Sequence, residues 1–496
     1  MTNQTIPTAA SKPYDFGDLY IDGRWQQGAA ATPLYVTSPW SGEPVARISA
    51  ASKADVDSAF TGARRAQPAW AAAIPGARAQ IFLEAARVME RRKGEIVDWL
   101  VREAGSTLTK ASIEWWAVHN SVLEAATLPS RVEGRILWGD YPDKENRIYR
   151  RPVGVVGVIS PWNWPLHLSM RSVAPALALG NAVVIKPSAE TPISGGLLIA
   201  KLFEEAGLPP GVLSVIAGRS SEIGDDFVQH PVPRVMSFTG STAVGRRAGK
   251  LALDSALIKR TMLELGGNGP LLVTEDVELS RAVDTAIVGK FLHQGQMCIA
   301  VNRIIVADAI HDAFVERFVA RARALPNGGP RDPGSVIGPL INREQLERVA
   351  TLVEQAQAQG ARLLLGEPVR GLVMPPRVLD EVTADMTIAR QEIFGPVATI
   401  LRAHDDDEAV RLANDTDMGL TSGVLCRDLG RAERLAARIE AGMTHINDIP
   451  AVDMPQMPFG GEKNSGLGRF GSQGVIDSFT TQHWISIQHS EQPLPF

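Results

Sequence analysis

A cysteine and a glutamate, each close to glycines, are the residues of this chain best suited to covalent chemistry. Cys298 is one of two cysteines among 496 residues and follows Gly295-Gln-Met, a loop-like setting in which a thiol can react. Glu264 ends an apolar run before Leu-Gly-Gly, where a carboxylate could serve as a general base. Together they suit an enzyme that forms a thioester on sulfur and then hydrolyses it. A buried inert thiol and an outward-facing glutamate remain the alternatives on local evidence.

Three further segments follow strand-like runs, where doubly wound sheets bind their ligands. Ser160-Pro-Trp-Asn163 could place the Asn163 amide where an oxyanion develops. Lys186-Pro-Ser188 could bind ribose hydroxyls, and Phe238-Thr-Gly-Ser241 precedes a helix-like run whose N–H groups could bind phosphate. Each motif is weak alone, because turn residues, solvated lysines and glycine turns that cap helices have the same appearance.

Other chemistries find little support in the sequence. The nine histidines show no HExxH spacing and the cysteines no CxxC spacing, so we expect no metal site. No GxSxG motif is present, which argues against a serine hydrolase. The glycines at 240 and 245 have the spacing of a P-loop, but Arg246 and Arg247 stand where its lysine and hydroxyl residue would be.

The elements that must position these residues alternate between helix and strand patterns. Apolar spacing predicts helices over 53–70, 77–104 and 343–359. Runs rich in apolar and β-branched residues predict strands in a first block at 153–159, 181–186, 212–216, 234–238 and 271–273, and in a second block at 303–306, 397–401 and 422–426. This alternation predicts an α/β fold with parallel sheets.

The segment 131–151 is polar and strand-like and carries Trp138, Tyr141 and Tyr149, so it resembles an arm more than a core element. We expect it to pair with the tail at 478–488. Edge strands of this kind are often covered by another subunit, which predicts an oligomer.

Size and composition limit the classes of protein. A chain of 496 residues is expected to form two or three domains. A net charge of −5 gives no basic surface for nucleic acid or anionic lipid. The apolar run at 172–185 is short and interrupted, and residues 1–13 lack the features of a secretory signal, so we expect a cytoplasmic protein without a membrane span. Two cysteines fit free thiols in a reducing compartment, a single Cys298–Cys426 bridge being the alternative.

Seven motifs in order and spacing resemble the aldehyde dehydrogenase superfamily over nearly the whole chain. They are Pro161-Trp-Asn163, Lys186-Pro-Ser188, Phe238-Thr-Gly-Ser241, Glu264-Leu-Gly-Gly267, Gly295-Gln-Met-Cys298, Glu392-Ile-Phe-Gly-Pro396 and Pro458-Phe-Gly-Gly461. The resemblance implies a doubly wound, Rossmann-like dinucleotide-binding domain (1–130 and 152–264) and an α/β catalytic domain (265–465). It also implies a β-arm for oligomerisation (131–151 and 475–496), in a homodimer or homotetramer.

The resemblance also implies roles for individual residues. Cys298 would attack the aldehyde, Asn163 and the Cys298 N–H would hold the oxyanion, and Glu264 would activate water against the thioester. The expected cofactor-binding residues are Ser160, Pro161, Trp162, Lys186, Ser188, Gly240, Ser241, Gly245, Leu265, Gly266, Glu392 and Phe394.

The cofactor and the substrate are less sharply defined by these motifs. Many NAD-preferring members carry glutamate three residues after the ribose-binding lysine, whereas this chain has Ala189 followed by Glu190. We expect NAD as the cofactor and leave NADP open. The chain resembles the branch that oxidises benzaldehyde- and vanillin-type aldehydes. The expected substrate-binding residues are Trp164, His167, Met297, Ile299 and Phe459. Aliphatic, terpenoid or semialdehyde substrates are the alternatives, ahead of a CoA-acylating enzyme or a catalytically inert homologue.

Overall fold

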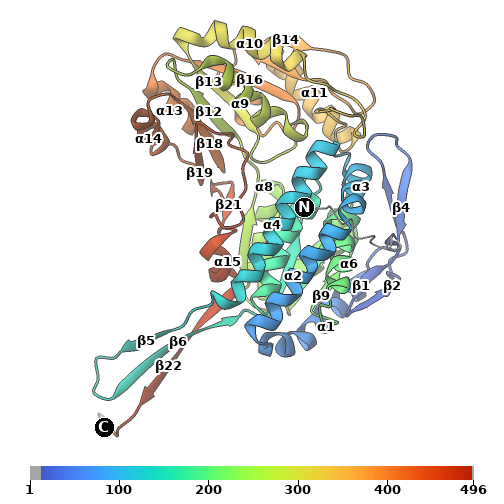
Figure 1. The fold of residues 1–496 in the computed structure, drawn as a ribbon, viewed down its shortest axis with the longest axis vertical. Helices are drawn as coiled ribbons and strands as arrows, with labels where there is room; N and C mark the ends of the chain where they lie inside the picture. Colours follow the sequence, from blue (N-terminus) through green and yellow to red (C-terminus); the bar gives the residue numbers. More distant parts are fainter. Residues whose placement is uncertain (1–12, 494–495) are drawn as a thin grey trace, which may run out of the picture.

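The computed structural model describes residues 13–493 and 496; residues 1–12, which contain nearly all of the segment inspected for a secretory signal, lie outside this range. Figure 1 shows an upper and a lower lobe, each containing a sheet, and a narrow arm that projects from the lower lobe. The α/β class expected from the alternating pattern is confirmed, and both sheets are largely parallel.

The sheet of the lower lobe has a parallel centre of five strands. In spatial order the eight strands are β2 (Arg24–Gln26), β1 (Leu19–Ile21), β9 (Leu213–Val215), β8 (Ala182–Lys186), β7 (Val155–Ile159), β10 (Val235–Thr239), β11 (Arg260–Glu264) and β21 (Gly466–Leu467). Strands β9 to β11 run parallel, and β1 and β21 pair antiparallel at their two sides. The chain progresses from β7 to β9 in one direction and then returns to the other side of β7 with β10. The carboxyl ends of β7 and β10 therefore form a topological switch point.

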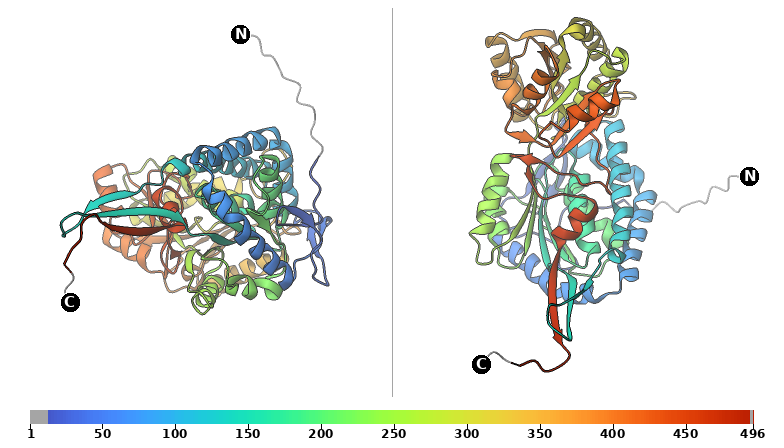
Figure 2. Two further views of the ribbon diagram at one scale, coloured as in Figure 1. Left: turned by 90° about the horizontal axis from the view of Figure 1, so that it is seen from below. Right: turned by 90° about the vertical axis from the view of Figure 1, so that its left-hand side faces the viewer.

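Helices cover both faces of this sheet (Figure 2). One face carries a contiguous row of three helices, α1 (Lys53–Ala72), α7 (Ser220–Gln229) and α8 (Thr242–Leu253). The other face carries α5 (Pro165–Ala178) and α6 (Leu198–Glu205), with α2 (Pro75–Arg91), α3 (Lys93–Ala104) and α4 (Leu108–Thr127) packed outside them. The lower lobe is therefore doubly wound, as expected.

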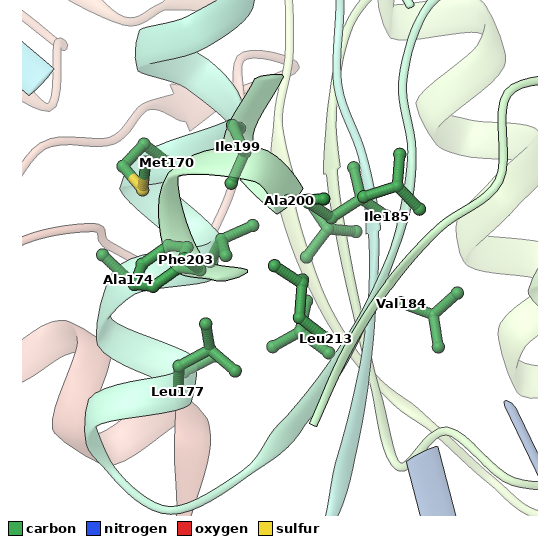
Figure 3. Close-up of a cluster of buried hydrophobic side chains, with 14 of the residues drawn as sticks. Met170, Ala174, Leu177, Val184, Ile185, Ile199, Ala200, Phe203 and Leu213 are labelled. Atoms are coloured by element: carbon green, nitrogen blue, oxygen red, sulfur yellow. The ribbon is translucent and has the colours of Figure 1, made fainter. Parts of the chain in front are cut away.

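The core between α5 and the sheet holds the start of α5 in a fixed place (Figure 3). The side chains labelled there come from α5, β8, α6 and β9, and each is at most 1% exposed: Met170, Ala174, Leu177, Val184, Ile185, Ile199, Ala200, Phe203 and Leu213. Close packing of this kind leaves little freedom for rigid-body movement. The residues at and just before the N-terminus of α5 are thereby positioned.

The sheet of the upper lobe follows directly from β11 through a short glycine-containing link. Its order is β14 (Arg362–Gly366), β15 (Arg377–Asp380), β16 (Val397–Ala403), β13 (Val301–Ala307), β12 (Gly269–Val273), β18 (Thr421–Leu425) and β19 (Met443–Ile446), with only β14 antiparallel. Its helices are α9 (Leu279–Phe291), α10 (His311–Arg323), α11 (Arg343–Ala358), α12 (Thr387–Arg390), α13 (Asp406–Asn414) and α14 (Leu429–Ala436). Smaller pairings join β3 (Leu34–Thr37) to β4 (Pro44–Ile48) and β17 (Met418–Gly419) to β20 (Glu462–Lys463).

The arm is a three-stranded antiparallel sheet. Strand β6 (Lys144–Pro152) lies between β5 (Arg135–Trp138) and β22 (Thr480–Gln488), which follows α15 (Ser472–Phe479). The register runs from the Thr480–Pro152 pair to the Gln488–Lys144 pair. The predicted pairing of the arm with the C-terminal tail is confirmed.

One predicted helix is wrong in part. The helix expected over 77–104 is divided into α2 and α3, because Arg92 leaves the helical conformation (φ −104°, ψ 13°) while its side chain binds Glu95 and Glu205. Cys298 and Cys426 are free, so the alternative of a disulfide between them does not hold. Among the described residues, no helix is both long and apolar enough to cross a membrane.

Candidate active site

A large cavity lies at the carboxyl ends of β7 and β10, where the topology places a ligand. It measures about 1250 Å³, including the space that opens to solvent. Eight of the twelve expected cofactor residues line it: Pro161, Trp162, Gly240, Ser241, Leu265, Gly266, Glu392 and Phe394. Two segments far apart in sequence are brought together there, since the rings of Trp162 and Phe394 meet edge to face at 5.3 Å between centroids.

The walls of this cavity fit a dinucleotide. The Ser241 side chain makes no capping hydrogen bond at the N-terminus of α8, so first-turn N–H groups are free to bind a phosphate. At Gly266, an added Cβ would lie 2.8 Å from Glu392 Oε2, so the backbone must remain bare for the carboxylate to approach. Glu392 Oε1 accepts the Gly267 N–H at 3.0 Å. Burial raises the pKa of Glu392 to about 7, although that N–H and the Arg348 guanidinium act against the rise.

The other four expected cofactor residues lie outside the cavity lining. Lys186 is buried at the end of β8 and donates to Ser220 Oγ at 2.8 Å, while the Ser188 hydroxyl accepts the Glu190 N–H. Ser160 is buried and accepts from Ser169 Oγ at 2.6 Å. Gly245 lies in the first turn of α8, where an added Cβ would lie 2.2 Å from Leu265 Cδ2. Packing alone therefore accounts for the glycine at position 245.

The two residues singled out first from the sequence are in direct contact. The Cys298 thiol donates to Glu264 Oε1 at 3.1 Å. Glu264 ends β11 of the lower sheet and is 1% exposed, whereas Cys298 lies three residues before β13 of the upper sheet. The pair therefore bridges the two lobes.

Electrostatics keep the thiol neutral in this state. Burial, followed by the nearby Glu264 carboxylate, raises the pKa of the Cys298 thiol well above its usual value, and the Arg171 cation only partly opposes this. A thiolate is the reactive nucleophile, so the sulfur must lose its proton as it attacks. Glu264 Oε1 is at hydrogen-bond distance to take that proton.

The loop that carries the thiol has an unusual backbone. His293 and Gln294 have φ values of +51° and +55°, and Gly295 follows at +70°. An added Cβ on Gly295 would lie 2.3 Å from the Gly395 carbonyl, and one on Gly267 would lie 2.0 Å from the Cys298 carbonyl. These glycines let three loops approach closely enough to set the sulfur beside Glu264.

Asn163 is held beside the sulfur by buried polar contacts. Its side-chain Nδ2 donates to the Gln296 backbone carbonyl at 2.9 Å, and the backbone carbonyl of Asn163 accepts from Lys110 Nζ at 2.8 Å. Lys110 also pairs with Glu114 at 2.5 Å, and both side chains are fully buried. Glu114 in turn accepts the backbone N–H groups of Leu166 and His167 in the first turn of α5. An amide held this way is preorganised to stabilise an oxyanion on a substrate bound at Cys298.

A second cavity, of about 800 Å³, reaches Cys298 from the side of α4 and α5. All five expected substrate residues line it: Trp164, His167, Met297, Ile299 and Phe459. Its other apolar walls include Ile113 and Trp116 of α4. The two cavities share Asn163, Leu168 and Cys298, so the sulfur stands where they meet.

Sequence reasoning missed the charged residues at the inner wall of this second cavity. Arg171 donates to Glu264 Oε2 at 2.7 Å and to Asp453 Oδ2 at 3.2 Å. His167 Nε2 lies 3.3 Å from the same Asp453 oxygen. The available signal was an arginine in an otherwise apolar helix, four residues after His167 and hence on the same helical face. Asp453 lies in an irregular segment and had no comparable signal.

Within residues 13–493, no cluster of three or more histidine, cysteine, aspartate or glutamate side chains could hold an ion. The site is thus built from a thiol, a carboxylate, an amide and a cavity suited to a dinucleotide.

These features define a two-lobed α/β protein in which a buried thiol and a carboxylate meet at the edge of a cavity suited to a dinucleotide. The model of the aldehyde dehydrogenase family matches residues 25–485, and the chain belongs to this family. Its members are oxidoreductases that act on aldehydes.

Individual relatives are similar over nearly their full length. The chain is 48% identical to a vanillin dehydrogenase of Corynebacterium glutamicum, over 97% of this chain and 100% of the relative. It is 44% identical to a benzaldehyde dehydrogenase of Bacillus subtilis, over 96% and 98% of the two chains. The crystal structure of an NAD-dependent benzaldehyde dehydrogenase from Corynebacterium glutamicum superimposes with a TM-score of 0.90 at 45% identity, covering 97% of this chain and 99% of that one.

The two cysteines give a matched test of the nucleophile. Cys298→Ala should reduce NAD-linked aldehyde oxidation by about 10⁴-fold or more, because no other thiol borders the cavities. Cys426→Ala, directly after strand β18 of the upper lobe, should retain activity within about threefold. NADH formation measures both, and cofactor binding by fluorescence should survive in each variant. Equal loss in the two variants would contradict the assignment.

Proposed function

We propose that this protein oxidises aromatic aldehydes of the benzaldehyde and vanillin type to carboxylic acids, with NAD as the cofactor. The observation that carries the proposal is the meeting of two cavities at Cys298, one fitted to a dinucleotide and one lined by Trp164, Phe459, Met297 and Ile299. A planar ring suits aromatic and apolar walls of this kind. The similarity to benzaldehyde and vanillin dehydrogenases supports the same substrate class.

In the proposed mechanism, Cys298 loses its proton to Glu264 and attacks the aldehyde carbon. The Asn163 amide and the Cys298 N–H stabilise the resulting oxyanion. When bound, NAD would supply the hydride acceptor, and loss of hydride from the adduct would leave a thioester on Cys298. Glu264 releases the thiol proton to solvent and can then accept a proton from water as the water attacks the thioester carbon. The C–S bond breaks, the acid leaves, and the proton returns to the sulfur.

The substrate class is testable by steady-state kinetics. We expect kcat/KM for benzaldehyde or vanillin to exceed that for acetaldehyde by at least about tenfold, because only a ring fills the apolar cavity. A semialdehyde that carries a carboxylate should be oxidised less well than benzaldehyde, since the cation in this cavity, Arg171, is already paired. Equal or better turnover of acetaldehyde or the semialdehyde would contradict the proposal.

We propose that NADP is tolerated as a second cofactor. Lys186 at the expected ribose site has Ser220 as its side-chain partner, and the Glu190 carboxylate instead binds Asn342 Nδ2 at 3.1 Å. In the hydrogen bonds described, Lys186 therefore has no carboxylate partner. Such a carboxylate would repel the 2′-phosphate of NADP.

Introducing that carboxylate should make the enzyme more selective. Ala189→Glu is expected to lower kcat/KM with NADP by about tenfold or more and to change the value with NAD by less than about threefold, because like charges repel. Glu190→Gln serves as the control and should leave the ratio of the two cofactors nearly unchanged. An unchanged ratio in the Ala189→Glu variant, with thermal stability preserved, would overturn this expectation.

We further propose that the protein assembles as a homodimer or homotetramer through its arm and works in the cytoplasm. Strand β5 is an edge strand whose Ile136 and Trp138 are 73% and 99% exposed, and β19 is an edge of the upper sheet. An exposed apolar edge favours pairing with a second copy. The two free cysteines fit a reducing compartment.

The arm can be tested by changing its exposed side chains. The double variant Ile136→Lys and Trp138→Lys should shift the mass measured by light scattering to that of a monomer, because charges cannot be buried in an apolar interface without cost. Trp40→Lys, at a residue 51% exposed on the loop between β3 and β4, is the matched control and should not change the mass. A monomeric wild type, or an unchanged mass in the double variant, would contradict the proposal.

A further inference from the structure

Arg171 is a buried cation shared by two carboxylates from distant parts of the chain. Its side chain is 6% exposed, and its two terminal nitrogens bind Glu264 and Asp453. The guanidinium carbon lies over the rings of Phe459 and Phe470, 4.4 and 4.3 Å from their centroids. Hydrogen bonds fix its plane and the rings restrict its movement, so Arg171 has little freedom to swing away.

This arrangement determines which way the Glu264 carboxylate faces. One oxygen accepts from the Cys298 sulfur at 3.1 Å, and the other accepts from Arg171 at 2.7 Å. A carboxylate that is 1% exposed needs a cation to remain charged at moderate cost. Arg171 therefore supplies both the orientation and the compensating charge of the proposed base.

Asp453 holds the other side of Arg171. Burial disfavours charge on Asp453, but the contacts with His167 and Arg171 outweigh burial and lower the pKa of this carboxyl. Burial likewise disfavours charge on Arg171, and Glu264 and Asp453 outweigh it and raise the pKa of the guanidinium. A guanidinium does not release its proton in proteins, so Arg171 cannot relay protons from Glu264. Its effect on the base must be electrostatic and geometric.

Cys298 and Glu392 also face Glu264, from two other segments of the chain. Cys298 faces it from the nucleophile loop as a neutral thiol. Glu392 approaches from the segment before β16, and its interaction with Glu264 disfavours two negative charges together. Lys290 in α9 acts on Glu392 instead. Among the described residues that face Glu264, Arg171 is the cation that donates a hydrogen bond to its carboxylate.

We propose that Arg171 is a positioning residue for the hydrolytic half of the reaction, in which it keeps Glu264 ionised and aimed toward the Cys298 sulfur. In that step, a water oxygen bonds to the thioester carbon while Glu264 takes a water proton. The C–S bond then breaks, the acyl group leaves as the carboxylic acid, and Glu264 returns the proton to sulfur. The step needs no oxidant or reductant. The inference rests on the proposed function, because it concerns the thioester that aldehyde oxidation leaves on Cys298.

The test separates the formation of the thioester from its hydrolysis. Arg171→Met should lower kcat by about 10- to 100-fold with little change in the benzaldehyde KM. A first turnover of NADH should still appear as a burst, and mass spectrometry should detect acylated Cys298 accumulating during turnover. The acid limb of the kcat profile should move to higher pH, because a cation no longer favours the charged carboxylate.

Two further variants distinguish positioning from a structural role. Arg171→Lys should restore much of kcat and return the acid limb toward the wild-type position. Asp453→Asn removes one anchor of Arg171 but keeps its charge beside Glu264, so it should lower kcat less than Arg171→Met does. This variant tests the proposal if Arg171→Met does not fold. Glu264→Gln is the reference for a lost base: because Glu264 serves in both halves of the proposed mechanism, this variant should slow the NADH burst as well as the hydrolysis of the acyl-enzyme.

The results that would contradict the role of Arg171 differ from those that would contradict the proposed function. If the wild type forms neither NADH nor acylated Cys298 with any aldehyde, the proposed function is wrong. If the wild type turns over and Arg171→Met matches it in kcat and pH profile, the Arg171 proposal is wrong. A raised KM with unchanged kcat, or a lost burst with cofactor binding intact, would also overturn it in favour of substrate binding or thioester formation.

Discussion

The contact between the Cys298 sulfur and the Glu264 carboxylate is the interaction on which the rest of the site depends. It joins the end of β11 in the lower sheet to the loop before β13 in the upper sheet. The link between the sheets passes Gly267, where an added side-chain carbon would overlap the Cys298 carbonyl. The two lobes must therefore dock closely for the contact between these two side chains to form.

Buried charges surround this contact in compensated groups. Lys110 and Glu114 neutralise one another beneath Asn163, and Arg171 lies between two carboxylates beside Glu264. Removing one member of a buried pair typically costs about 3–5 kcal/mol, because the remaining charge loses its partner. The site thus gains fixed geometry from interactions that add little net stability. Such preorganisation lets the polar groups act during reaction without first rearranging.

Much of the fold and part of the site could be predicted from the sequence. The alternation of strand and helix patterns predicted the parallel sheets, and the motifs around Asn163, Glu264 and Cys298 were found because glycines and strand ends are local signals. The break at Arg92 was not predictable, since it depends on Glu205 far along the chain. Asp453 was missed for the same reason: its role arises only where an irregular segment meets α5. The roles inferred for individual residues remain predictions.

Because the two cavities meet only near the Cys298 sulfur, most residues that line one cavity can be substituted without changing the other. Their linings have Asn163, Leu168 and Cys298 in common, whereas Ile113, Trp116 and Phe459 belong to one and Glu392 and Phe394 to the other. A substitution in α4 can alter the space for a ring without touching the dinucleotide side. A change of substrate preference can therefore arise from residues of one cavity while the residues that line the dinucleotide cavity stay the same.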